Sequence, residues 1–249
     1  MLNVYCLKWG SKYGPEYVNR LYASVATHYQ GEFIFHCITE DPEDIHEDVV
    51  ILEYIDLYLA ASTVFTVEKL EIMKRHTGDK NLLLDLDILI HNDITDIVDG
   101  ACTDKPTFIW TDWTPEWHKR HLIKKKLACY VNSSFVVWSG TSANFLYDHF
   151  LSSDNMSLEY DSCDKYIFYE HYWDMARPFH PLAPHAIRFF PSGKFYNYNE
   201  GKQKYQFQEK FSACLFNTSH LIGSDRRYYE LDNTPNWATD LWEQYDDYF

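Results

Sequence analysis

The sequence predicts an α/β protein with a mostly parallel central sheet flanked by helices. Two observations lead to this prediction. Short apolar runs of strand character alternate with longer stretches whose apolar residues recur at helical spacing, and the alternation continues through the first half of the chain. Hydrophobic residues make up 46% of the 249 residues, so the chain can bury a sizeable core and is not a disordered polymer.

Local signals predict the elements of the first half. Pro15 is placed to open a helix because its fixed φ suits the first helical turn. Gly78 and Asp79 end a second helix, for which Ser62 or Thr63 is the candidate N-cap. We expect strands at 3–9, 32–39, 49–55 and 81–90, and helices at 15–29 and 62–76.

The second half of the sequence is less regular, with many aromatic residues and several Pro and Gly residues. Thr141 or Ser142 is expected to cap its first helix. No internal repeat, low-complexity tract or linker interrupts the chain, so we expect a single domain over 1–249. The predicted strands are 106–113, 129–140 and 210–220, and the predicted helices are 141–153 and 161–175.

The stretch NLLLDLDILI (81–90) places two carboxylates, Asp85 and Asp87, among aliphatic residues. Side chains alternate along a strand, so both should lie on the same side, where like charges repel. A hard cation at the strand end, Mg²⁺ or Mn²⁺, would remove this repulsion by taking oxygen ligands. Alternatively, Asp87 begins a turn and Asp85 caps a neighbouring helix. We favour the metal site.

Composition argues against several classes of function. The net charge is −15, from 22 basic and 37 acidic residues, which argues against a nucleic-acid partner. No run approaches the roughly 20 apolar residues that a transmembrane helix needs, and the N-terminus lacks the layout of a signal peptide. Six scattered cysteines without a CxxC pair predict reduced thiols, no zinc site and a cytoplasmic location.

Four separated motifs resemble those of one enzyme family. Their order and spacing are similar to those of GT-A glycosyltransferases, in particular family eight, which includes glycogenin and the lipopolysaccharide galactosyltransferases. The resemblance covers most of the chain and implies a GT-A, Rossmann-like fold. The nucleotide-binding half then lies at about 1–100, and the acceptor and sugar half at about 101–249. The motifs are FTVEKLEI (65–72), LLLDLD (82–87), CYVNSSFVVW (129–138) and SCDKYIFYEH (162–171).

The resemblance implies how the donor is held. Asp85 and Asp87 would bind Mn²⁺, or Mg²⁺, against the diphosphate of a nucleotide-sugar, and the Lys69 cation would lie near this donor. A lysine inside an apolar helical pattern fits a second interpretation as well, in which its stem covers apolar surface and its ammonium reaches solvent.

The resemblance also implies residues around the transferred sugar. Asn132 and Ser133 would face the donor sugar and the acceptor, and Asp164 and Lys165 would complete the catalytic group, with Asp164 orienting the donor sugar. The chain departs from the family pattern twice. Ser134 replaces a glycine, which changes how closely an acceptor approaches, and Lys165 replaces a glutamine, which bears on the choice of donor sugar.

The nucleotide itself is expected at the ends of the first two strands. By resemblance, Trp9, Tyr13 or Tyr17 would stack on the base, and the segment from Thr39 to Asp41 would contact it. An aromatic face tolerates any base, and such stacking contributes about 1–3 kcal/mol. The competing interpretation for each ring is core packing, because the chain contains 20 tyrosines.

The third metal ligand is expected near the C-terminal predicted strand. The family places a histidine in a His-x-x-Gly segment followed by a lysine that binds the diphosphate. His220 and Gly223 reproduce this spacing, and Arg226 and Arg227 follow where the lysine would be. Asn217 is the alternative ligand, through its amide oxygen. We favour His220.

Taken together, these features predict a metal-dependent glycosyltransferase that moves a sugar from a UDP-sugar to a hydroxyl acceptor, with retention of configuration implied by the resemblance. The basic stretch WHKRHLIKKK (117–126) would suit an anionic glycan acceptor, but we favour a solvated helix face. The alternatives are a sugar nucleotidyltransferase, which needs a Gly-rich basic phosphate loop such as KWGSKYG (8–14), and a non-catalytic glycan- or nucleotide-binding protein.

Overall fold

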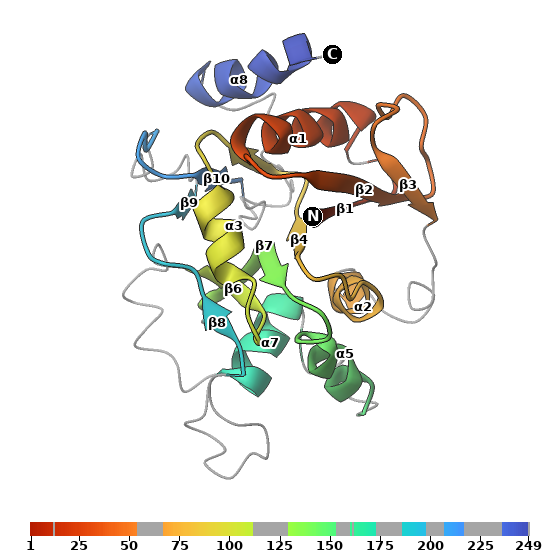
Figure 1. The fold of residues 1–249 in the computed structure, drawn as a ribbon, viewed down its shortest axis with the longest axis vertical. Helices are drawn as coiled ribbons and strands as arrows, with labels where there is room; N and C mark the ends of the chain where they lie inside the picture. Colours follow the sequence, from red (N-terminus) through yellow and green to blue (C-terminus); the bar gives the residue numbers. More distant parts are fainter. Residues whose placement is uncertain are drawn as a thin grey trace, which may run out of the picture.

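The computed structural model describes residues 1–11, 13–53, 67–111, 129–152, 160, 162–172, 186–197, 207–216 and 236–248 (Figure 1). Within these residues there are two β-sheets. The larger has seven strands: β1 (Leu2–Lys8), β2 (Phe33–Thr39), β3 (Val50–Glu53), β4 (Asn81–Leu84), β6 (Thr107–Trp110), β7 (Val131–Trp138) and β8 (Arg188–Phe189). The smaller has three: β5 (Ile88–Ile90), β9 (Phe195–Asn197) and β10 (Ala213–Leu215).

The larger sheet is mostly parallel, as the sequence predicts. Its strand order is β3-β2-β1-β4-β7-β6-β8, and β7 is antiparallel to both of its neighbours. The chain moves outward from β1 to β3 and then returns to place β4 on the other side of β1. Strand order therefore reverses between β1 and β4. In open α/β sheets, ligands bind at the carboxyl ends of the strands at such a point.

Helices cover both faces of the larger sheet. Side chains alternate along each strand, so Val4 and Cys6 enter the core beneath one set of helices, whereas Tyr5 enters the core beneath the other. In Figure 1, α1 lies on one side of β1 and β2, and α2 on the other. The first set is α1 (Pro15–His28) and α3 (Thr95–Ala101), and beyond it α8 (Asn236–Glu243) and the short 3₁₀ helix η3 (Gln244–Tyr248) pack against α1 and β5. The second is α2 (Val67–Arg75), α5 (Asn144–Leu151) and α7 (Cys163–His171).

The stretch 81–90 is not one continuous strand. It divides into β4 and β5, which belong to different sheets, with a turn at Leu86 and Asp87 between them. The prediction of a single strand is therefore wrong. Apolar residues on both sides of the turn enter the core, so composition alone does not reveal the break. The alternative to the metal site predicted a turn at Asp87, and the structure has a turn there.

The second half also differs in detail from the prediction. The residue before α5 is Ala143, which has no side-chain cap, while the Ser142 hydroxyl accepts a hydrogen bond from the Ser139 amide at 3.2 Å. The capping role predicted for Thr141 or Ser142 is therefore wrong. Of the apolar run at 210–220, the structure describes residues 210–216, and within these the strand is the three-residue β10. No helix among the described residues is both long and apolar enough to cross a membrane.

Candidate active site

Asp85 and Asp87 lie where the chain leaves the larger sheet for the smaller one. The Asp85 amide donates to the Ser134 carbonyl on β7 at 2.9 Å, which continues the β4–β7 pairing by one residue. The Asp87 carbonyl accepts from the Phe216 amide, just after β10, at 3.1 Å. Each aspartate backbone is thus fixed by a different sheet. Both side chains are partly exposed and lie at the carboxyl end of β4.

Lys69 reaches this point from α2. Its ammonium lies 2.5 Å from Asp85 Oδ1, and its side chain is only 13% exposed. The same ammonium donates to the carbonyl and the hydroxyl of Ser133, at 3.3 and 3.2 Å. Glu68 precedes it in the first turn of α2, and Leu70 is buried in the core. The lysine therefore points at the candidate site, which excludes the interpretation as a solvent-reaching surface lysine.

Asn132, Ser133 and Ser134 open strand β7 beside the aspartates. The Ser133 amide donates to Asp164 Oδ1 at 3.0 Å, and the Ser134 amide donates to the side-chain carbonyl of Asn132 at 2.9 Å. Asp164 occupies the first turn of α7, where Ser162 caps the helix by accepting from the Lys165 amide at 3.2 Å. The antiparallel direction of β7 brings its first residues to the same edge as the end of β4.

The electrostatics of this group are dominated by carboxylates. Burial alone would lower the pKa of Lys69, but the negative charges of Asp85 and Asp164 outweigh it and hold the pKa above its ordinary value. Burial raises the pKa of Asp164, while Lys69 and the hydrogen bonds from Ser133 act in the opposite direction. Asp85 and Asp164 both act on the Lys69 ammonium, and Asp87 lies two residues beyond Asp85, so carboxylates gather here in a way that suits a cation.

Tyr13, in the loop before α1, contacts Asp87, and Tyr17 on α1 packs against the Tyr13 ring. The Tyr13 hydroxyl donates to Asp87 Oδ2 at 3.3 Å, and the pKa of this phenol is raised by burial and by the charges of Asp87 and Asp85. Both carboxylates therefore lie near one hydroxyl group. The Tyr17 ring is 4% exposed and packs between Tyr13 and Trp242. Tyr17 lies in the core, whereas Tyr13 is half-buried and better placed to meet a ligand.

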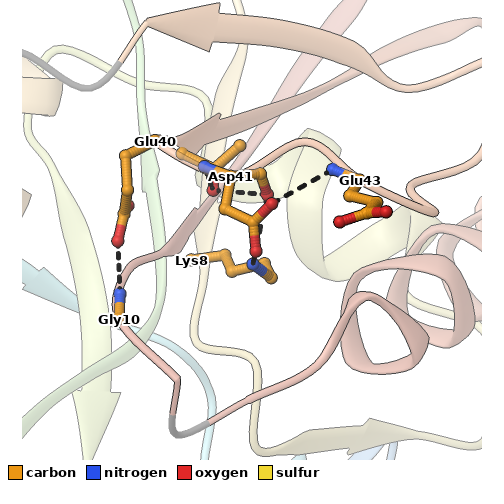
Figure 2. Close-up of polar contacts among 6 residues, drawn as sticks. Lys8, Gly10, Glu40, Asp41 and Glu43 are labelled. Carbon is orange, nitrogen blue, oxygen red and sulfur yellow. Dashed lines mark hydrogen bonds and ion pairs between the residues drawn. The ribbon is translucent and has the colours of Figure 1, made fainter.

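The ends of β1 and β2 are joined by a second polar group, shown in Figure 2. The buried ammonium of Lys8 contacts the carboxylate of Asp41 at 3.2 Å and its carbonyl at 3.1 Å. The Thr39 hydroxyl bonds to the same residue through its amide and carbonyl, at 3.0 and 3.1 Å. The Gly10 amide donates to Glu40 Oε1 at 2.5 Å. These contacts connect the end of β2, at Thr39, with the two loops on which Asp41 and the 38% exposed Trp9 lie.

Several predicted site residues lie outside the described part of the chain. Asn217, His220 and Arg226 are among them, as is the basic stretch 117–126, so their roles stay predictions. Within the described ranges, no three or more His, Cys, Asp or Glu side chains are grouped to hold a metal ion. The third metal ligand predicted from the sequence, His220, lies outside the described ranges.

Sequence reasoning missed two contacts of this region. The hydroxyl of Tyr13 on Asp87, and the pairing of Lys8 with Asp41, join segments that are 74 and 33 residues apart. No local sequence pattern predicts either contact. For the contact of Lys8 with Asp41, the sequence gives one indication: the alternation of strands and helices predicts that β1 and β2 pair in parallel, which brings the ends of the two strands together.

Two cavities lie away from the aspartates. One, of about 240 Å³, lies between α2 and the sheet, beside Leu7, Leu52 and His76. The other, of about 330 Å³, lies between α3 and β8, beside Ile97 and Arg188. Neither is lined by Asp85, Asp87 or Lys69. The position of the candidate site therefore rests on the convergence of its polar groups at the sheet edge and not on the size of a cavity.

Comparison with known proteins shows the fold. No protein-family model and no curated protein matches the chain. The galactosyltransferase LgtC, solved in complex with donor and acceptor sugar analogs, is similar over 98% of this chain and 95% of its own, with a TM-score of 0.60 and 14% identity. An active-site mutant of LgtC matches with the same coverage and identity and a TM-score of 0.62. The chain thus has the GT-A fold that the sequence motifs implied.

Proposed function

We propose that the chain is a glycosyltransferase that moves a sugar from a nucleoside diphosphate donor, a UDP-sugar, to a hydroxyl group of a glycan, lipopolysaccharide-like or protein acceptor, with retention of configuration. One observation carries the proposal. Asp85, Lys69, Ser133 and Asp164 come from four elements and form one polar group at the carboxyl end of β4. This is the switch point where open α/β sheets bind their ligands. The GT-A fold, shared with LgtC, supports the proposal.

A divalent cation fits the proposed site. Asp85 and Asp87 lie two residues apart at the end of β4, and hard cations such as Mn²⁺ and Mg²⁺ prefer carboxylate oxygens. When bound, the cation would supply Lewis-acid neutralisation of charge on the departing diphosphate. Its presence would also offset the repulsion between the two carboxylates, which Lys69 alone offsets at Asp85.

The side chains of the chain itself would bind and orient the donor. Lys69 places a positive charge beside the position proposed for the diphosphate, where such a charge stabilises the transition state more than the bound substrate. Asp164 accepts hydrogen bonds from the amide and the side chain of Ser133, so its carboxylate has a fixed direction from which it would orient the donor sugar. Asn132 is held in turn by the Ser134 amide. Tyr13 offers its ring to the base.

The nucleotidyltransferase alternative is weakened by the loop after β1. That chemistry needs backbone amides and lysines of the loop to surround phosphates. The Gly10 amide donates to Glu40, and Lys8 is paired with Asp41, so two of the groups required are already bound to acidic side chains (Figure 2). Lys12, the other lysine of this loop, lies outside the described residues.

A hydrolysis assay separates the three functions. The protein is incubated with a panel of UDP-sugars and Mn²⁺ without acceptor, and free sugar and UDP are measured. A glycosyltransferase releases both slowly, because water replaces the acceptor. A nucleotidyltransferase acts only when pyrophosphate is added and forms UTP, and a binding protein forms no product. Formation of UTP, or no turnover of any nucleotide sugar in the panel, would contradict the proposal.

A further inference from the structure

Tyr13 connects the part of the site proposed for the nucleotide with the part proposed for the metal. It lies in the loop between β1 and α1, and its ring packs against Tyr17 with a centroid distance of 4.8 Å. Its hydroxyl donates to Asp87 Oδ2. Asp87 is therefore held from two directions: its carbonyl by the Phe216 amide next to β10, and its carboxylate by Tyr13.

We propose that the Tyr13 hydroxyl is a positioning group for Asp87, which orients this carboxylate toward the divalent cation and thereby couples cation binding to nucleotide binding. The inference rests on the proposed function. Asp87 lies on a turn between two sheets and not inside a strand, so the strand geometry does not fix the direction of its side chain. A hydrogen bond to one oxygen does so, and a carboxylate has further lone pairs for a cation.

The length of the hydrogen bond from Tyr13 to Asp87 indicates that the hydroxyl contributes to orientation more than to stability. An O–H···O hydrogen bond is usually 2.5–3.0 Å long, and the contact of Tyr13 with Asp87 is 3.3 Å. Such a bond contributes little to folding. Residues that orient a metal ligand nevertheless change metal affinity by about 10- to 100-fold when they are mutated. Loss of the hydroxyl should therefore affect cation binding much more than stability.

Nucleotide binding and cation binding are coupled because the two ends of the Tyr13 side chain have different roles. The ring is the candidate surface for the base, and the hydroxyl orients the candidate metal ligand. A base that fixes the ring also fixes the hydroxyl on Asp87, so nucleotide should strengthen cation binding. By thermodynamic reciprocity, the cation must strengthen nucleotide binding by the same factor. Removal of the hydroxyl alone should weaken this coupling without removing the stacking surface, and the part that remains would come from contact between the cation and the diphosphate.

The test compares Tyr13→Phe with the wild-type protein by titration calorimetry. Mn²⁺ affinity is measured with and without UDP, and UDP affinity is measured with and without Mn²⁺. We expect Mn²⁺ to bind about 10- to 100-fold more weakly to Tyr13→Phe, with an unchanged UDP affinity in EDTA and a thermal midpoint close to wild type. Tyr22→Phe is the matched control, because Tyr22 also donates to a carboxylate at 3.3 Å, that of Asp48, away from the site.

A second variant separates the ring from the hydroxyl. Tyr13→Leu removes both and should weaken UDP binding in EDTA as well as Mn²⁺ binding. Equal Mn²⁺ affinity of wild type and Tyr13→Phe, with Mn²⁺-dependent UDP binding in both, would overturn the inference and leave the proposed function standing. Absence of any UDP binding to the wild-type protein would instead overturn the proposed function and this inference together.

Discussion

Lys69 shows how one side chain joins the elements of the site. Its ammonium contacts the end of β4 through Asp85 and the start of β7 through Ser133. The pKa of Lys69 is raised although the side chain is largely buried, because the charges of Asp85 and Asp164 outweigh the effect of burial. The lysine therefore remains charged at every pH at which the protein would act. A permanent cation at this place suits an anionic diphosphate.

Replacement of Lys69 by methionine should reduce turnover far more than stability. The variant keeps the apolar stem but loses the charge proposed to act on the leaving diphosphate. Loss of one such electrostatic group typically lowers kcat by roughly 100- to 1,000-fold. We expect the thermal midpoint to change by no more than about 5 °C. Steady-state kinetics and thermal melting would measure the two quantities.

The control for this prediction is Lys74→Met on the same helix. Lys74 pairs with Asp148 at 2.8 Å, on an exposed part of α2. Exposed pairs of this kind contribute about 0–1 kcal/mol, so both turnover and stability should remain near wild type. Wild-type kinetics of Lys69→Met would show that the lysine is only structural.

At the scale of elements, the C-terminal helices hold the region that carries Asp87. Tyr245 in η3 is 3% exposed, and its hydroxyl donates to the Ile90 carbonyl at the end of β5 at 2.7 Å. Arg20 on α1 lies over the Trp242 ring at 3.9 Å and pairs with Asp246 at 2.5 Å. Helix α8 and η3 thus connect α1 to the smaller sheet. Through β5, this packing supports the turn at Asp87.

Replacement of Tyr245 by phenylalanine should destabilise the fold measurably. The buried Ile90 carbonyl would lose its hydrogen bond from the tyrosine hydroxyl, which costs about 1–3 kcal/mol. The free energy of unfolding in urea would measure this loss. Tyr248→Phe is the matched control, since Tyr248 lies in the same 3₁₀ helix and is 47% exposed. An equal stability of Tyr245→Phe and wild type would show that the contact does not hold β5.

Sequence reasoning predicted the long, regular elements well and the short ones poorly. The strand expected at 3–9 is Leu2–Lys8, and the helix expected at 15–29 is Pro15–His28, because periodicity and Pro15 are local signals. The strands β8 and β9 have two and three residues, too few for a period to appear. The same reasoning found Lys69 near Asp85, through motif resemblance. It did not find Tyr13 on Asp87, because that contact depends on tertiary packing.

At the scale of the whole molecule, one buried and three half-buried histidines should make stability depend on pH. Burial lowers the pKa of His91 to about 4, against an ordinary value of 6.5. His91 is 8% exposed, and Tyr196 lies at hydrogen-bond distance, 3.1 Å, from its Nε2. Burial also lowers the pKa values of His28, His36 and His76. The folded state therefore keeps these rings neutral at a pH where the unfolded chain takes up protons.

We expect the protein to lose stability as the pH falls from 6.5 to about 4, the value of the folded-state pKa of His91. Over this range the unfolded chain binds more protons than the folded one, so the free energy of unfolding decreases with falling pH. His91 alone should account for roughly 3 kcal/mol by the lower end. Urea unfolding at several pH values measures the change. His91→Gln should have a flatter profile, and an unchanged profile would contradict the assignment.

The single domain expected from the sequence, with a nucleotide-binding half and an acceptor half, stays a prediction. The switch point between β1 and β4 belongs to the first half, and Asn132, Ser133 and Asp164 belong to the second. The candidate site therefore uses residues from both halves. In a glycosyltransferase this arrangement would bring the donor and the acceptor together at one edge of the sheet.

Calorimetric titration of UDP in the presence of Mn²⁺ tests the central claim most directly. Mn²⁺ should strengthen UDP binding to the wild-type protein, and Asp85→Asn and Asp87→Asn should each abolish this Mn²⁺-dependent binding while their circular dichroism spectra remain those of the folded protein. Asp148→Asn, which alters an exposed carboxylate on α5, should bind as the wild type does. Unchanged affinity for UDP and Mn²⁺ in both Asp85→Asn and Asp87→Asn would contradict the assignment of this site.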